Sequence, residues 1–258
     1  GDEVPDGWIK LTLRHHDLEY SWQALADKIK QTLSCDVDWF SNHCVAVFKV
    51  QAAAAAVENV IAEAGDDVLI LSAGQSIEIL KEKGLPQEIA AKFNLSGMKG
   101  THIIGHTRMA TESAVTMEGS HPFSTGMDLC LVHNGSLSNH NRLRLELERQ
   151  GVKFVTENDS EVAAGYLTWR LREGDTLNEA LKNALKDLDG FFTFTIGTRD
   201  GFAVMRDPIA CKPAVLAETD DYVAMASEYQ ALTTLPGIEN AKVWEPEPAT
   251  VYVWERGQ

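Results

Sequence analysis

The sequence predicts a mixed fold of strands and helices in packed layers, and three observations favour it. Helical patterns fill a central block, residues 139–190, and strand patterns lie on both sides of it. The strands after this block follow one another in the manner of hairpins. Strands and helices do not alternate regularly and no internal repeat is present, so the pattern is not that of a regular βαβ protein. We therefore expect one domain over residues 1–258, with residues 1–100 as a less regular front section.

In the front section, apolar residues at helical spacing predict helices and short apolar runs predict strands. The helix at 51–65 is rich in alanine, the best helix former, and stops at Gly65. The helix at 86–93 has Pro86 in its first turn, where the missing N–H costs nothing. The predicted elements are helices at 20–33, 51–65 and 86–93 and strands at 43–50 and 68–74.

Beyond residue 100, a strand is expected to enter a polar turn over residues 101–111, and another strand covers 129–133. The helix at 159–174 has Asp159 or Ser160 as its N-cap candidate. Thr176 and Glu179 have the spacing of a capping box. The remaining elements are helices at 139–151, 159–174 and 176–190 and strands at 191–198, 201–207, 213–218, 221–228 and 250–256.

Composition excludes several classes of function. The chain carries 23 Lys and Arg against 38 Asp and Glu, a net charge of −15, so it repels nucleic-acid phosphates. No apolar run approaches the roughly 18 residues of a membrane span, and the first ten residues lack the pattern of a signal peptide. The four cysteines form no CxxC pair and have no zinc-ligand spacing, which predicts free thiols, no metal site and a cytoplasmic location. They are Cys35, Cys44, Cys130 and Cys211.

Six polar turns at predicted strand ends are the sites where chemistry is expected. They are GHTRMAT (105–111), SHPF (120–123), HNG (133–135), NDSE (158–161), RDPIACKP (206–213) and ASE (226–228). In this order, over roughly residues 100–256, they resemble the class II glutamine amidotransferases, glutaminase domains of N-terminal-nucleophile type. That family includes amidophosphoribosyltransferase, glucosamine-6-phosphate synthase, asparagine synthetase and glutamate synthase. The resemblance implies an α+β fold, a four-layer αββα sandwich of two antiparallel sheets between helix layers.

The same resemblance implies how L-glutamine is held by its two charged ends. Arg108 matches the arginine that grips the α-carboxylate, a contact that a guanidinium makes bidentately. Asp159 matches the aspartate that receives the α-ammonium. Each residue also has a plainer interpretation, because Arg108 alone reads as a surface arginine and Asp159 alone as a helix cap. Thr111 and His121 are implied as further residues of the glutamine pocket.

Asn134 and Gly135 match the family's oxyanion hole, in which an amide side chain and a backbone N–H stabilise the charge that develops on the substrate oxygen. The alternative for Asn-Gly is a hairpin turn. A helix pattern rather than a returning strand follows, which argues against the hairpin. His133 belongs to the same motif, and a structural role is expected for it rather than catalysis.

The family's nucleophile is an N-terminal cysteine whose own amine acts as the general base. Residue 1 is Gly1, and Cys130 lacks such an amine and lies on the opposite strand face from His133. Two explanations stay open. The natural protein begins earlier, with the cysteine on a first strand absent here, or the chain is a relative that binds glutamine without hydrolysing it.

No acceptor domain follows the motifs, so the resemblance implies that ammonia passes to a separate synthase subunit in a hetero-oligomer. The long front section is most similar to stand-alone glutaminase subunits of glutamate synthase-like and N-methylglutamate synthase-like proteins. That comparison implies FMN and iron–sulfur centres in the partner and no cofactor in this chain. The alternatives are a catalytically inactive glutamine-binding or regulatory subunit and a structural subunit of the same complex.

Overall fold

The computed structural model describes residues 3–65, 67–107 and 116–256. These residues form six α-helices and three sheets whose paired strands are antiparallel, which confirms the predicted α+β class. The chain divides into two compact units, residues 1–130 and 131–258. The interpretation as a single glutaminase domain stays a prediction.

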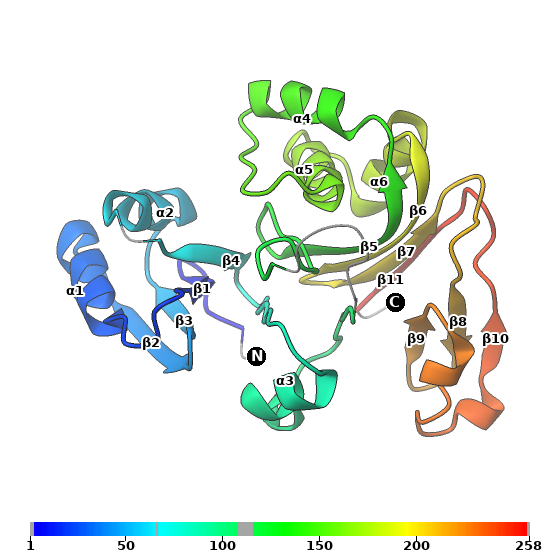
Figure 1. The fold of residues 1–258 in the computed structure, drawn as a ribbon, viewed down its shortest axis with the longest axis horizontal. Helices are drawn as coiled ribbons and strands as arrows, with labels where there is room; N and C mark the ends of the chain where they lie inside the picture. Colours follow the sequence, from blue (N-terminus) through cyan, green and yellow to red (C-terminus); the bar gives the residue numbers. More distant parts are fainter. Residues whose placement is uncertain (1–2, 66, 108–115, 257–258) are drawn as a thin grey trace. The chain divides into compact units, whose positions relative to one another are not determined.

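The first unit contains a regular βαββαβ arrangement in a front section that we expected to be less regular (Figure 1). The strand order is β2-β3-β1-β4, and each neighbouring pair is antiparallel. The elements are β1 (Ile9–Arg14), α1 (Trp22–Leu33), β2 (Val37–Asn42), β3 (Val45–Val50), α2 (Ala54–Glu63) and β4 (Leu69–Gly74).

The two faces of this sheet have different chemistry because side chains alternate along each strand. One face is apolar, and both α1 and α2 pack on it through a core that includes Leu11, Ile29 and Phe48. The other face is rich in cations. Lys10 pairs in register with Lys49, so their side chains share this second face, which lies opposite α1 and α2.

The chain after β4 is held by Asp128, a residue that sequence patterns did not single out. The Asp128 carboxylate accepts backbone N–H bonds from Gln75 (2.7 Å), Ser76 (2.9 Å) and Ile77 (3.1 Å). The segment then forms α3 (Pro86–Lys92) and the short 3₁₀ helix η1 (Leu95–Gly97). The strand predicted to enter the polar turn within 101–111 is wrong, because residues 101–107 have no regular secondary structure. The rest of the predicted turn, residues 108–111, lies outside the described residues.

The second unit contains two antiparallel sheets with orders β11-β7-β6-β5 and β10-β8-β9. Figure 1 shows α4, α5 and α6 together above the strands β5, β6 and β7. In helix α5, residues 160–167 are all buried. Helix α6 begins with the predicted Thr176–Glu179 capping box. The elements are β5 (Leu129–Leu137), α4 (His140–Arg149), α5 (Asp159–Arg172), α6 (Leu177–Asp187), β6 (Gly190–Thr198), β7 (Gly201–Arg206), β8 (Val215–Glu218), β9 (Val223–Ala226), η2 (Tyr229–Ala231), η3 (Ile238–Asn240), β10 (Lys242–Trp244) and β11 (Val251–Glu255).

Strands β1, β2 and β10 were not among the predicted elements, whereas all six predicted helices are present with ends shifted by up to three residues. Across the part of the chain that the structure describes, no helix has the length and apolar character needed to span a bilayer.

Candidate functional site

The Asn134-Gly135 pair lies inside a strand, not in a turn. Strand β5 runs without interruption from Leu129 to Leu137, and α4 begins three residues later. The predicted polar turn after residue 133 is therefore wrong, and so is the hairpin alternative. The strand continues because Gly135 allows β5 to pack unusually closely against β6.

Gly135 has φ +148°, a value that L side chains rarely adopt, and a Cβ here would lie 2.0 Å from the Phe191 carbonyl oxygen. Gly190, at the start of β6, is its counterpart: it has φ +145°, and a Cβ there would lie 2.2 Å from the Ser136 carbonyl oxygen. Each glycine thus makes room for the backbone of the other strand. Sequence patterns did not identify Gly190, although a glycine just before the apolar run at 191–196 is a signal of this kind.

Polar groups on β5 and on the first turn of α5 bind one another. The buried His133 ring makes a hydrogen bond of 2.9 Å between its Nδ1 and the Ser160 hydroxyl. The same Nδ1 lies 3.8 Å from Asp159 Oδ1. The His133 ring stands edge-on to Phe194, with ring centroids 5.0 Å apart. These contacts fit the structural role expected for His133.

Asp159 does not cap α5, contrary to the cap predicted from sequence. The N-cap is Asn158, whose side-chain oxygen accepts the Ser160 N–H at 2.8 Å. Asp159 is instead the first residue of the helix, and its Oδ2 accepts the Leu137 N–H at 2.8 Å. The Ser160 hydroxyl donates to Asp159 Oδ1 at 3.3 Å.

This geometry leaves the Asp159 carboxylate able to accept more bonds. An ionised carboxylate has about four lone-pair sites, and two protein donors are recorded here. The side chain keeps 21% of its surface exposed. A half-buried carboxylate with unused lone pairs can accept hydrogen bonds from an ammonium group.

Asn134 lies between the two β5 residues that contact Asp159. Strand alternation puts its side chain on the face opposite to His133 and Leu137, and the residue is half-buried. Within the described ranges, no hydrogen bond is recorded for its amide. An amide of this kind is available as a donor to a ligand.

The structure therefore brings Asn134, Gly135 and Asp159 together at the junction of β5 and α5. Arg108 and Thr111 lie outside the described residues. His121 belongs to the first unit, where its buried ring packs against His106 and Phe123 with centroids 4.5 and 5.2 Å apart. The glutamine-binding roles of Arg108, Thr111 and His121 stay predictions.

The RDPIACKP segment (206–213) forms hydrogen bonds that hold the backbone of the sheet next to the candidate site. The buried Asp207 carboxylate accepts the N–H groups of Phe192 (2.9 Å) and Ile209 (2.8 Å). Arg206 donates to the carbonyl oxygens of Pro246 (2.9 Å) and Lys212 (2.8 Å). Because Phe192 follows Phe191, which packs against Gly135, these bonds fix the β6 backbone that the Asn134-Gly135 strand contacts.

Comparison with known proteins decides the family. The model of a glutamine amidotransferase domain matches residues 106–234. The glutamine amidotransferase-like protein GlxB of Rhizobium meliloti is 61% identical over 251 residues, covering 97% of this chain and 83% of that protein. The chain belongs to the glutamine amidotransferase family.

More distant relatives agree with this membership. An amidophosphoribosyltransferase of Methanocaldococcus jannaschii is 35% identical over 167 residues, which is 64% of this chain and 36% of that protein. The solved glutamine phosphoribosylpyrophosphate amidotransferase from B. subtilis, complexed with ADP and GMP, superposes with TM-score 0.52 at 23% identity. That match covers 96% of this chain and 47% of the solved chain. At this identity the likeness shows the fold alone.

The amidotransferase match covers every residue predicted for the site, including those of the first unit. Within the described ranges, no group of three or more His, Cys, Asp or Glu side chains is arranged to hold a metal ion. Cys44 and Cys130 are buried and form no disulfide, and Cys130 packs with Leu71, Ile79 and Met117. The contact between Ser160 and His133 was not predicted from sequence, because it joins two motifs 27 residues apart.

Proposed function

We propose that this chain is a glutamine amidotransferase subunit that hydrolyses L-glutamine to glutamate and ammonia and passes the ammonia to a separate synthase subunit. The single observation that supports it best is the geometry at β5 and α5. Asp159, half-buried and in contact with Leu137, lies beside the strand that carries Asn134 and Gly135. The family membership supplies the substrate class.

In the proposed mechanism the glutamine α-ammonium binds Asp159 and the α-carboxylate binds Arg108. A thiolate sulfur attacks the side-chain amide carbon, and the amide oxygen takes negative charge. The Asn134 amide and the Gly135 N–H donate to that oxygen, which lowers the barrier only in the transition state. The C–N bond breaks as a proton reaches the leaving nitrogen, so ammonia departs and a thioester remains. Water then releases glutamate and restores the thiol.

We assign the nucleophile to an N-terminal cysteine, as the family resemblance implies. Its α-amino group, with an ordinary pKa of about 7.7–8.0, moves the proton from sulfur to nitrogen at neutral pH. Cys130 is not a substitute, because it is packed among apolar side chains. Labelling the natural full-length protein with the glutamine analogue diazo-oxo-norleucine, followed by peptide mapping, should place the adduct on the terminal cysteine. An adduct on any of the four cysteines of this chain would contradict the assignment.

The central experiment measures glutaminase activity of the natural protein with and without Asn134. We expect Asn134→Ala to lower kcat by about 10²–10³ with little change in KM, since the lost bond forms in the transition state. Ser136→Ala is the matched control, because Ser136 is an exposed residue of the same strand. Equal activity of both variants would refute the oxyanion role.

The ammonia acceptor is proposed to be a glutamate synthase-like or N-methylglutamate synthase-like subunit that carries FMN and iron–sulfur centres. Co-purification of the natural protein with its partner, followed by an absorption spectrum, tests this step. A partner without flavin or iron would contradict it. If the protein binds glutamine but releases no ammonia even with the partner present, it is an inactive glutamine-binding subunit and the proposal of an enzyme is wrong.

A further inference from the structure

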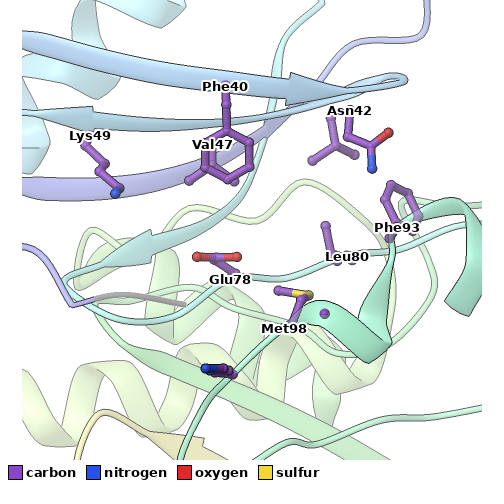
Figure 2. A pocket seen from close by; sticks show the side chains of 11 residues that line it. Phe40, Asn42, Val47, Lys49, Glu78, Leu80, Phe93 and Met98 are labelled. Carbon is purple, nitrogen blue, oxygen red and sulfur yellow. The ribbon is translucent and has the colours of Figure 1, made fainter.

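A cavity of about 340 Å³ opens on the face of the first unit's sheet that lies opposite α1 and α2. Its size is within the range of about 300–1,000 Å³ that small-molecule sites occupy. Strands β2 and β3 form one wall, and the segment from Glu78 to Lys99 forms the other (Figure 2). All of its lining residues lie between positions 40 and 99, outside the residues 106–234 that match the amidotransferase domain.

Alternation along the strands explains the composition of the first wall. Val45, Val47 and Lys49 are every second residue of β3, and Phe40 pairs with Val47 in register. These side chains point away from the helix-covered core, which takes Ala46 and Phe48 from the same strand. Most of the cavity surface is apolar, with Leu80, Phe93 and Met98 completing it from the opposite wall.

Two of the three cations on this sheet face form ion pairs with acidic side chains. The third, Lys49, lines the cavity. The buried Lys10 pairs with Glu78 at 3.0 Å. Arg14 pairs with Glu82 at 3.1 Å, and Lys92 joins the same carboxylate at 2.8 Å. These pairs engage Glu78 and Glu82, two of the three acids in the segment from Glu78 to Lys99.

Lys49 is the cation without a recorded counter-charge. It is half-buried at the cavity edge, and within the described ranges no acid lies within 4.0 Å of its ammonium. Asp38 is its register partner on β2, but Asp38 is exposed and no ion pair joins the two. Glu78 stands on the opposite wall in Figure 2 and is already bonded to Lys10. Lys99 adds a second positive charge to the lining.

We propose that this cavity binds a small organic anion with an apolar body, with its acidic group on Lys49 and its hydrocarbon part between Val47 and Met98. A half-buried ammonium gains a charge-assisted hydrogen bond from such a ligand, and the apolar walls lose contact with water. The chain as a whole has a net charge of −15 and repels anions. Selective binding of an anion therefore requires a local positive site of this kind.

Three probes with one apolar body and different charges test the proposal: phenylbutyrate, the neutral phenylbutyramide and the cationic phenylbutylamine. Isothermal titration calorimetry with the full chain should show saturable binding of the anion, with the amide and the amine each about tenfold weaker or more. Tighter binding of the amine, or no saturable binding of phenylbutyrate at millimolar concentration, would overturn the proposal.

Lys49→Met keeps the length of the side chain and removes its charge. We expect it to weaken phenylbutyrate by about tenfold and to leave phenylbutyramide unchanged. Lys153→Met, at an exposed lysine of the second unit, is the matched control and should change neither. Unchanged phenylbutyrate affinity in Lys49→Met would overturn the assignment of the anion to this residue.

Met98→Trp narrows the cavity without altering a buried core position, because Met98 is an exposed residue of the lining. It should weaken phenylbutyrate and phenylbutyramide alike, with an unchanged thermal unfolding midpoint showing that the fold is intact. If Met98→Trp instead changes the sedimentation coefficient and leaves probe binding untouched, the cavity is a contact between copies and the ligand assignment fails.

Discussion

The Asp159 carboxylate accepts a hydrogen bond from the backbone N–H of Leu137, with Oδ2 and N 2.8 Å apart. This bond joins the first turn of α5 to the end of the strand that carries Asn134 and Gly135. One side chain thus stabilises the junction and offers its remaining lone pairs to a ligand. The two roles can be separated, because the backbone bond needs only an acceptor oxygen whereas an ammonium ligand also needs negative charge.

Asp159→Asn is expected to keep the fold and lose the ligand. The asparagine oxygen can still accept the Leu137 N–H, so the thermal unfolding midpoint should fall by only a few degrees. Glutamine affinity should drop by about tenfold or more, since a charge-assisted bond to the α-ammonium becomes a neutral one. Calorimetry with L-glutamine measures the effect.

The matched control is Glu157→Gln, two residues before Asp159 in the loop that leads into α5, where the side chain is 94% exposed. It removes an equal charge from the same part of the surface. We expect glutamine binding to change less than twofold. A similar loss in both variants would mean that net charge, not contact with Asp159, governs the affinity.

Gly135→Ala should destabilise the protein far more than an ordinary glycine substitution. A Cβ at position 135 meets the Phe191 carbonyl oxygen at 2.0 Å in addition to the unfavourable φ. We expect a loss of about 3 kcal/mol or more in the free energy of unfolding. Gly151→Ala is the control, because Gly151 has φ +80° with no atom within 4 Å, and it should cost only about 1 kcal/mol. Urea denaturation that gives equal losses would refute the close approach of β5 and β6.

Much of the second unit could be predicted from sequence because its signals are local. The capping box of α6 is present, with Thr176 N–H donating to Glu179 at 2.9 Å. Other features depend on distant partners. Strand β1 alternates Ile9, Leu11 and Leu13 with polar residues that include two cations, and nearly all of these side chains are buried. The polar side can be buried because its cations bond to Glu78 and Glu82, which lie 68 residues further along the chain.

The candidate site shows the same limit. Asn-Gly is a turn signal, yet the close packing of Gly135 on β6 keeps the pair extended. In the run Asn158-Asp159-Ser160, each residue type is a good N-cap, so the sequence could not fix the cap to one position. The structure selects Asn158 and thereby frees Asp159 to contact Leu137.

Tyr166→Phe tests a hydrogen bond that joins α5 to α6. The buried Tyr166 hydroxyl donates to Asp187 Oδ2 at 2.5 Å. Burial first, and then this bond, raise the pKa of Tyr166 above its ordinary value of 10.0. Because folding raises this pKa, the bond stabilises the native state below pH 10 and its contribution falls as the pH rises above 10.

At neutral pH we expect Tyr166→Phe to cost about 1–3 kcal/mol, since the Asp187 carboxylate loses its donor. Urea denaturation measures the change, and the difference from the parent protein should shrink above pH 10. Tyr229→Phe, at a 44% exposed position, is expected to change nothing. A cost that stays constant into the alkaline range would show that packing, not the hydrogen bond, carries the stabilisation.

Glu82 predicts a second pH dependence, in the acidic range. Burial acts to raise the pKa of its carboxyl, but hydrogen bonds from Lys92, the Lys83 N–H and Arg14 outweigh burial and lower the pKa from 4.5 to about 2. Because folding lowers this pKa, the carboxylate stabilises the native state fully above pH 4.5, and the stabilisation is lost as the pH falls from 4.5 to about 2. The shift corresponds to roughly 3 kcal/mol.

Glu82→Gln should therefore lower the free energy of unfolding by about 2–3 kcal/mol at pH 7 and by almost nothing near pH 2. Urea denaturation across this pH range measures the difference between variant and parent. Glu63→Gln, at an exposed residue of α2, is the matched control and should give no difference at any pH. A Glu82→Gln cost that does not shrink on acidification would mean that the variant acts through packing of the segment after β4. In that case the ion pairs with Arg14 and Lys92 would contribute little to holding that segment on the sheet.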